Sequence, residues 1–285
     1  MAGMALCATA ASCSSDDDAV SAPKTLSATA TIDNSNTRTS YEDQGAGMAL
    51  EVDWKDSETF KAYYTEGGTT PLIFTKTDGS AFVATDVPEG VSASTTFTGV
   101  YGQKVTYNPE TGKYAIDFSG QDGTLENLAK YDIMVANSTT DANGLKFGFK
   151  HVCAFVKVTL KRGSNTTENT VAGRRYFSLE FGEACLADPN MQISGMDQRE
   201  WIDSKALFII NFNLASDLAL NEERTLYLAV PALNYKSNSR STFIGSGQGY
   251  HKSVSLSNSF KLEAGKVYET SIDYQGSVWG TGVPD

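Results

Sequence analysis

Alternation of apolar and polar residues with a period of two is the dominant pattern in this sequence, and it constrains the fold more than any other feature. The clearest example is residues 24–33, whose apolar members are Leu26, Ala28, Ala30 and Ile32. That pattern predicts a strand with one buried face. In residues 145–161 both parities are apolar, which indicates a strand covered on both faces that bends or changes sheets near Gly148. Further strands are predicted at residues 49–54, 59–64, 71–76, 103–108, 113–118, 174–181, 207–212, 225–230 and 266–274.

Helical turns are predicted only at residues 123–130 and 216–223, so the sequence predicts an all-β fold. A chain of 285 residues is long enough for two ordinary domains. The polar stretch NSTTDANG, between Ala136 and Leu145, has the composition of a linker. We therefore expect a β-sandwich domain at residues 24–143 and a second one at residues 144–285.

The N-terminus has the features of an export signal. Residues 2–12 are small or apolar and carry no charge, a length that suits the core of a signal peptide and is too short to span a bilayer. A basic start is missing, so either translation begins further upstream, which we favour, or the signal interpretation is wrong. Residues 10–13, AASC, resemble the lipobox of bacterial lipoproteins. We therefore expect a signal peptide at residues 1–12 and lipid on Cys13.

Three consecutive aspartates follow in the segment SSDDD. Like charges in a row keep a segment extended and solvated, so residues 13–23 are predicted to be an acidic tether between the lipid and the first domain. An acylated cysteine binds a membrane through its buried CH₂ groups without any spanning helix. The expected location is the outer membrane or the cell surface.

Composition and motifs argue against several functions. The net charge of −11 opposes binding to nucleic acid. Neither histidine has a catalytic setting, because His151 lies in an apolar strand and His251 in a Gly/Ser-rich loop, so we expect both to be structural. No metal-ligand spacing is present, and we expect no enzyme activity, metal or cofactor. Cys153 and Cys185 either form a disulfide or remain free thiols, and we favour the free thiols.

Several segments, in order along nearly the whole chain, resemble the fimbrillin family, the subunits and accessory proteins of type V pili in Gram-negative bacteria. The matching segments are CSSDDD (13–18), TRTSY (37–41), VDWKDSETF (52–60), SGQDGTLENLAKYDIMVA (119–136), FGFKHVCAFVKVTL (147–160), LYLAVPAL (226–233) and LEAGKVYE (262–269). The resemblance implies two tandem transthyretin-like β-sandwich domains, in agreement with the two-domain all-β prediction.

The resemblance also implies a way of assembly. In that family an N-terminal strand is cut off after an arginine, and a strand donated by the next subunit fills the exposed groove. Here the matching strand is Leu26 to Ile32, and the cut would fall between Arg38 and Thr39. An equally acceptable interpretation is that Arg38 is only a loop charge, since Arg174 and Arg175 offer another trypsin-like site. The implied partners are other pilin subunits in a fimbrium.

Residues 275–285 contain three glycines, which is unfavourable for a donor strand. We therefore expect a tip, anchor or accessory subunit that supports cell adhesion, without distinguishing these roles. The main alternative is a surface lipoprotein that binds glycans of a host or bacterial surface. Its candidate stacking residues are Tyr63, Tyr64, Trp201, Tyr235 and Trp279.

Overall fold

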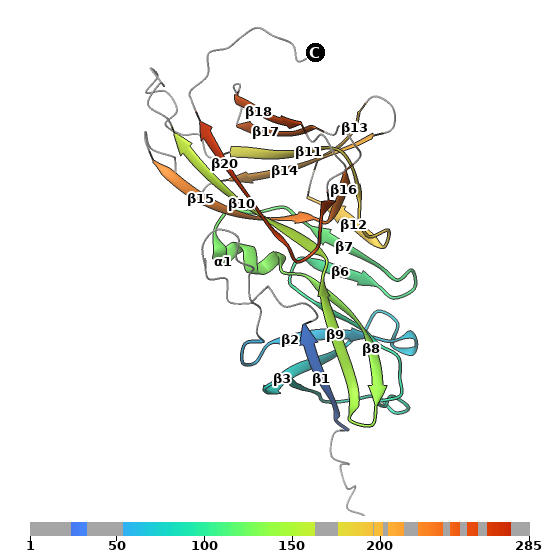
Figure 1. The fold of residues 1–285 in the computed structure, drawn as a ribbon. Helices are drawn as coiled ribbons and strands as arrows, with labels where there is room; N and C mark the ends of the chain where they lie inside the picture. Colours follow the sequence, from blue (N-terminus) through green and yellow to red (C-terminus); the bar gives the residue numbers. More distant parts are fainter. Residues whose placement is uncertain are drawn as a thin grey trace, which may run out of the picture.

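Strands dominate the computed structural model of this chain (Figure 1), and the all-β prediction is confirmed. The structure describes residues 24–32, 54–162, 176–195, 197–201, 205–213, 222–235, 240–245, 250–255 and 261–274. Its helical elements in these ranges are α1 (Leu125–Leu128), η1 (Thr65–Gly67) and η2 (Ala129–Tyr131). The turn α1 begins where the Thr124 hydroxyl accepts a hydrogen bond from the backbone N–H of Asn127, which confirms the turn predicted at 123–130.

Seven of the described strands close into a barrel at the lower end of Figure 1. They are β1 (Leu26–Ile32), β2 (Thr59–Tyr63), β3 (Leu72–Asp78), β4 (Ala81–Ala84), β5 (Thr98–Tyr101), β8 (Met134–Asp141) and β9 (Gly144–His151). Around the barrel their order is β1, β4, β3, β2, β5, β8, β9 and back to β1. The first of the described strands, β1, therefore lies beside β9, which is the last barrel strand along the chain.

A three-stranded sheet joins the two halves of the sequence. It consists of β6 (Val105–Asn108), β7 (Lys113–Asp117) and β12 (Met191–Ser194), in the order β12, β7, β6. The pair β6–β7 is the hairpin expected around the turn YNPETGKY, and β12 pairs with β7 in parallel. Because β12 comes from the C-terminal half, the two halves share backbone hydrogen bonds as well as side-chain contacts.

The C-terminal half forms two further sheets. The first places β10 (Cys153–Arg162) between β15 (Glu223–Pro231), which is antiparallel to it, and β20 (Val267–Tyr274), which is parallel to it. In the second sheet β11 pairs with β14, β16 and β17. Its strands are β11 (Tyr176–Leu186), β13 (Asp197–Trp201), β14 (Lys205–Asn213), β16 (Leu233–Tyr235), β17 (Arg240–Gly245), β18 (Tyr250–Ser255) and β19 (Lys261–Leu262).

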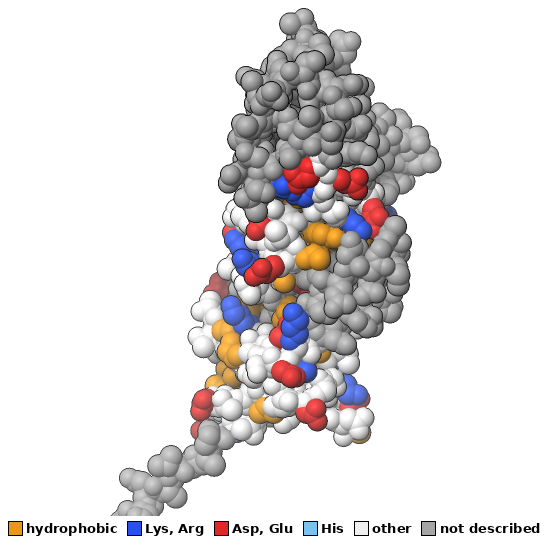
Figure 2. Space-filling view, turned by 90° about the vertical axis from the view of Figure 1, so that its left-hand side faces the viewer, with side chains coloured by type: hydrophobic (Ala, Val, Ile, Leu, Met, Phe, Trp, Pro, Cys, Tyr) orange, Lys and Arg blue, Asp and Glu red, His pale blue; other side chains and the backbone are white. Residues whose placement is uncertain are grey.

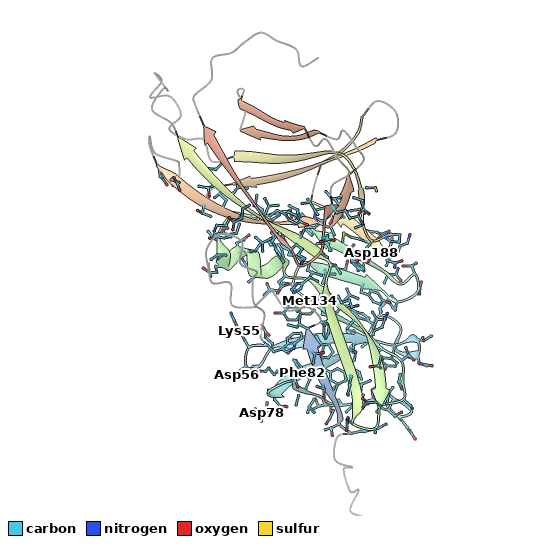
Figure 3. All side chains as sticks on the ribbon, in the orientation of Figure 1. Lys55, Asp56, Asp78, Phe82, Met134 and Asp188 are labelled. Atoms are coloured by element: carbon cyan, nitrogen blue, oxygen red, sulfur yellow. The ribbon has the colours of Figure 1, made fainter. Side chains whose placement is uncertain are left out.

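Among the described residues, two groups of buried side chains lie in the barrel and next to it. One fills the barrel and contains its phenylalanines. The other lies between the barrel, the β12–β7–β6 sheet and the β15–β10–β20 sheet, and includes Tyr131, Phe155 and Met191. Figure 3 shows Phe82 among the barrel strands, with Lys55, Asp56 and Asp78 on the outside. On the face in Figure 2, apolar atoms form small groups between charged and polar ones.

The passage from barrel to C-terminal sheets differs from the expected one. The polar stretch at residues 137–144 forms the end of β8 and the β8–β9 hairpin, and β9 completes the barrel. The apolar run that follows changes sheets, as one of the two expectations had it, but at Val152, since Gly148 is an exposed position inside β9. It is interrupted at Val152, where the backbone N–H bonds to the carbonyl of Ile133 at 3.0 Å. The chain leaves the barrel at that residue.

Candidate functional site

Strand β1 closes the barrel by pairing with two strands at once. On one edge it runs antiparallel to β4, with Leu26 opposite Ala84 and Thr29 opposite Ala81. On the other edge it runs parallel to β9, from Ala28 opposite Leu145 to Ile32 opposite Phe149. We call the space between β4 and β9 that β1 occupies the β1 seam. Without β1, the backbone groups along both sides of the seam would lose their partners.

The side chains of β1 alternate between the core and the surface as the sequence predicted. Leu26, Ala28 and Ala30 are buried, Ala30 completely, whereas Ser27 and Thr31 are exposed. Ile32 packs partly against the same core. Burial of an alanine methyl contributes only about 0.8 kcal/mol, against roughly 1.5–3 kcal/mol for a leucine side chain. Backbone pairing on both edges is therefore a large part of what holds β1 in place.

Aromatic rings fill the barrel beneath β1. The Phe60 and Phe74 rings stack with centroids 5.1 Å apart, and the Phe147 ring lies 4.9 Å from Phe60. In the sheet, Ala28 is flanked by Phe82 of β4 and Leu145 of β9, and Ala30 is paired with Phe147 of β9. The small residues of β1 thus lie beside large residues of its neighbours, which is the size complementarity expected of a tightly packed core.

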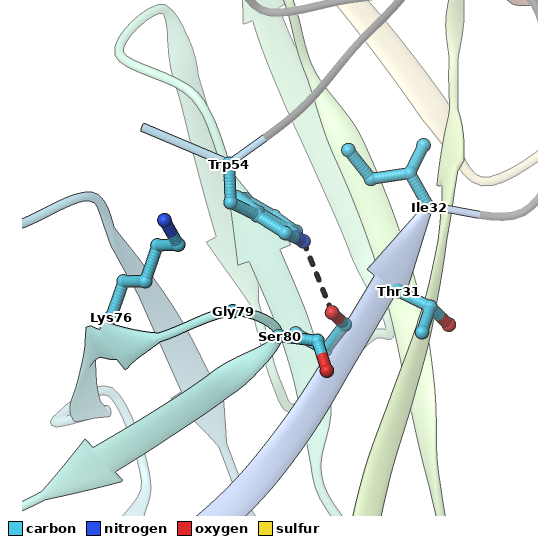
Figure 4. Close-up of a pocket in the computed structure, with 7 residues that line it drawn as sticks. Thr31, Ile32, Trp54, Lys76, Gly79 and Ser80 are labelled. Carbon is cyan, nitrogen blue, oxygen red and sulfur yellow. Dashed lines mark hydrogen bonds between the residues drawn. The ribbon is translucent and has the colours of Figure 1, made fainter. Parts of the chain in front are cut away.

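The indole of Trp54 holds β1 from the side. Its Nε1–H donates to the carbonyl oxygen of Ala30 at 3.1 Å (Figure 4), and the N–H of Ala30 donates to the carbonyl of Ser80 at 2.9 Å. The indole is edge-on to the rings of Phe82, Tyr101 and Phe149, with centroids 5.1–5.4 Å apart. Its position is therefore set by residues outside β1.

A pocket of about 500 Å³ lies at the end of β1, beside Trp54 (Figure 4). The lining residues are Ala30, Thr31, Ile32, Trp54, Lys76, Gly79 and Ser80. Lys76 is largely buried and forms an ion pair with the exposed Asp56, with Nζ and Oδ1 3.1 Å apart. The pocket is continuous with the β1 seam because three of its lining residues belong to β1.

Among the predicted site residues, Leu26, Ala28, Ala30 and Ile32 lie together in β1. Cys13, Arg38 and Thr39 lie outside the described residues, as do the predicted signal peptide and tether, so these assignments stay predictions. Sequence reasoning missed Trp54 as a site residue. The sequence could have indicated Trp54, because it belongs to the family-like segment VDWKDSETF and directly precedes the polar turn before β2.

His151 has the structural setting that was expected. Its Nδ1 lies 2.8 Å from Oδ1 of Asp132, and both side chains are almost completely buried. The His151 ring is edge-on to Phe155. His251 lies in β18, and its side chain is outside the description. Among the described residues there is no group of three His, Cys, Asp or Glu side chains that could hold a metal ion.

Of the five aromatic residues proposed for glycan stacking, the two whose side chains are described do not lie on the surface. Tyr63 and Tyr64 are buried, each 8% exposed, and belong to the two cores. The side chains of Trp201, Tyr235 and Trp279 lie outside the described residues.

Of the helical elements in the described ranges, none is long or apolar enough to span a bilayer.

Comparison with known proteins points to one family. A family model described as fimbrillin-like matches residues 14–283. No curated protein matches the chain. A candidate cell adhesion protein from Bacteroides ovatus has a similar solved structure, with 12% identity, coverage of 88% of this chain and 93% of that one, and a TM-score of 0.44. A fimbrial assembly protein from Parabacteroides distasonis is 11% identical, with coverage of 87% and 90% and a TM-score of 0.33. Both TM-scores are below 0.5, so the fold of this chain is defined by its own strand pairing.

Proposed function

Because this chain belongs to the fimbrillin-like family, we propose that it is a fimbrial subunit at the cell surface that assembles by donor-strand exchange and supports cell adhesion. We propose a tip, anchor or accessory position in the fimbrium. The supporting observation is β1: a strand near the N-terminus closes the barrel with partners on both edges, and the following segment contains Arg38.

The proposed mechanism begins with hydrolysis of the Arg38–Thr39 peptide bond by a trypsin-like protease. The cut leaves β1 joined to the barrel only by hydrogen bonds and by the burial of its inward side chains, two of which are alanines. Its departure exposes the edges of β4 and β9 together with the aromatic core. An extended strand from a neighbouring subunit satisfies the backbone groups and covers the core in one step.

The proposal includes an anchor and a domain organisation. Residues 1–12 are proposed to be removed, with lipid on Cys13 holding the chain at the outer membrane before processing. The chain is proposed to contain two tandem transthyretin-like domains, with the boundary moved from residue 143 to Val152, because β9 completes the barrel. A repeated strand arrangement supports this proposal: β1 is parallel to β9 and antiparallel to β4, and β10 is likewise parallel to β20 and antiparallel to β15.

The test uses protein that begins at Ala19, treated with limiting trypsin. We expect mass spectrometry to find a cut after Arg38, the cut chain to lose stability as its N-terminal fragment leaves, and native gels to show a complex when a peptide of residues 24–32 is added as the donor strand. Arg38→Gln is the matched control and should remain uncut there and monomeric. The mechanism is wrong if the fragment leaves and the remaining chain keeps the unfolding midpoint of the intact protein.

A further inference from the structure

We infer that the β1 seam selects its incoming strand by side-chain size, and that Trp54 fixes the register of that strand. This inference rests on the proposed function. The two consecutive inward positions now held by Ala28 and Ala30 accept only a residue of about alanine size. The inward positions on either side, held by Leu26 and Ile32, accept a large apolar residue. The partner is therefore a strand with the pattern large, small, small, large at every second residue.

The size limit follows from what surrounds the two alanines. Both are buried, and their neighbours across the sheet, Phe82 and Phe147, are completely buried. These rings belong to the packed group of the barrel: Phe147 lies 5.6 Å from Phe74, and Phe82 lies 5.1 Å from Phe60. A leucine in place of Ala28 or Ala30 would have to displace rings that are themselves confined, because interiors packed at this density resist added volume.

The register follows from the backbone of Ala30. Its carbonyl accepts from Trp54 and its N–H donates to Ser80. The indole is held by rings of β4, β5 and β9, so its N–H still faces the seam after β1 has left. An incoming strand must present a carbonyl there. A shift by one residue would turn polar side chains inward. A shift by two would place a large residue beside Phe147 in one direction and beside Phe82 in the other.

The outward positions are less restrictive. Ser27 and Thr31 are exposed and Thr29 is partly exposed, so polar residues suit the intervening positions. The strand enters parallel to β9 and antiparallel to β4, as β1 does. The chemistry of the occupant is therefore defined over seven residues, from the position of Leu26 to that of Ile32.

The principal experiment frees β1 without relying on Arg38. A recognition sequence for a site-specific protease is placed between residues 40 and 50 of protein that begins at Ala19. The cut protein is incubated just below its unfolding midpoint with a fluorescent peptide of residues 24–32, and binding is followed by anisotropy. Peptides with Ala28→Leu or Ala30→Leu should bind about tenfold more weakly or worse. The matched Thr29→Leu peptide should bind within about threefold of the original.

A compensating variant tests the steric cause. In Phe147→Leu protein, the Ala30→Leu peptide should recover part of its binding relative to the original peptide, because the smaller side chain leaves room beside position 30. A Trp54→Phe protein should bind the original peptide more weakly, since it lacks the N–H that meets the carbonyl of position 30.

The outcomes separate this inference from the proposed function. Equal binding of the original and Ala30→Leu peptides would overturn the size rule and leave strand exchange standing. Failure of every peptide, the original included, would count against strand exchange itself. In that case the size rule is tested in the intact chain by urea unfolding. Ala30→Leu should lower the unfolding midpoint clearly, whereas Thr29→Leu should not. Equal midpoints for the two variants would overturn the size rule.

Discussion

The side-chain amide of Gln121 hydrogen bonds to both backbone groups of Ala229. Its Oε1 accepts from the N–H of Ala229 at 2.7 Å, and its Nε2 donates to the carbonyl of Ala229 at 3.0 Å. Two residues further along, the carbonyl of Gly123 accepts from the N–H of Tyr227 at 2.9 Å. The segment 121–123 therefore covers the outer edge of β15 as a neighbouring strand would, and removes a place where another chain could pair.

Gln121→Ala should lower the free energy of unfolding by at least about 2 kcal/mol, because it leaves two buried backbone groups of Ala229 without partners. Urea unfolding followed by circular dichroism measures the effect. Gln192→Ala is the control, since Gln192 is exposed in β12, and it should change stability by less than about 0.5 kcal/mol. Equal midpoints for the two variants would contradict the assigned role of Gln121.

Asp132→Ala should destabilise the protein by about 1–3 kcal/mol, because it removes the polar group that faces Nδ1 of the buried His151. A double-mutant cycle with His151→Gln isolates the interaction. The double variant should lose less stability than the two single variants together. Additive losses would mean that the 2.8 Å approach of the two side chains contributes little.

Glu58 should make stability depend on pH. Burial raises the pKa of its carboxyl above the usual value, although hydrogen bonds from the N–H of Lys55 and the hydroxyl of Tyr101 oppose the shift. A raised pKa means that the folded state binds the proton more tightly, so this contribution to stability is complete at low pH and is lost as pH rises through the raised pKa. Relative to Glu58→Gln, the wild type should therefore become less stable between acidic and neutral pH. A difference that is constant with pH would contradict this prediction.

The two cysteines of protein that begins at Ala19 should differ in reactivity. Both are free, Cys153 buried and Cys185 exposed, so the expectation of free thiols is confirmed. Burial raises the pKa of the Cys153 thiol, and a buried protonated thiol reacts slowly. A thiol reagent should modify one residue of the native protein quickly and two after unfolding. Cys185→Ser should abolish the fast phase, and a persisting fast phase would place Cys153 at the surface.

Gly195→Ala should destabilise the junction of the two halves. Gly195 follows β12 with φ of +68°, and a Cβ there would lie 2.3 Å from Oδ1 of Asp117 and 2.5 Å from the N of Ser119. Strain of this kind costs about 1–3 kcal/mol. Gly148→Ala is the control, because its Cβ would meet open space, and it should be neutral or slightly stabilising. Similar unfolding midpoints for the two variants would show that the junction yields easily.

The sequence predicted local structure better than long-range pairing. The alternation of residues 26–32 predicted β1 because burial of one face imposes a period of two. It contained no information on its neighbours, since the paired residues of β4 and β9 lie about 55 and about 117 residues away and pairing depends on the closed barrel. The polar end of β8 was interpreted as a linker because residues 137–141 face outward or end the strand. Four-residue strands such as β4 and β5 are too short to show a period.

For the candidate site, the alternation predicted which residues of β1 face inward but not what they face. The match between Ala30 and Phe147 arises only when β1 and β9 lie side by side, and Trp54 joins the site only because the barrel brings its indole to the carbonyl of Ala30. Arg38 and Cys13 were proposed from resemblance. Their positions in the sequence do not indicate which residues lie near them in space.

Strand β1 is flanked on both edges, and the same would hold for any strand that replaced it in a fibre. Tension along such a fibre would pull the inserted strand lengthwise, so the bonds to β4 and to β9 would resist sliding together instead of opening one after another. A joint of this geometry resists stretching better than one whose bonds open in sequence. Such a joint suits a surface appendage exposed to fluid flow.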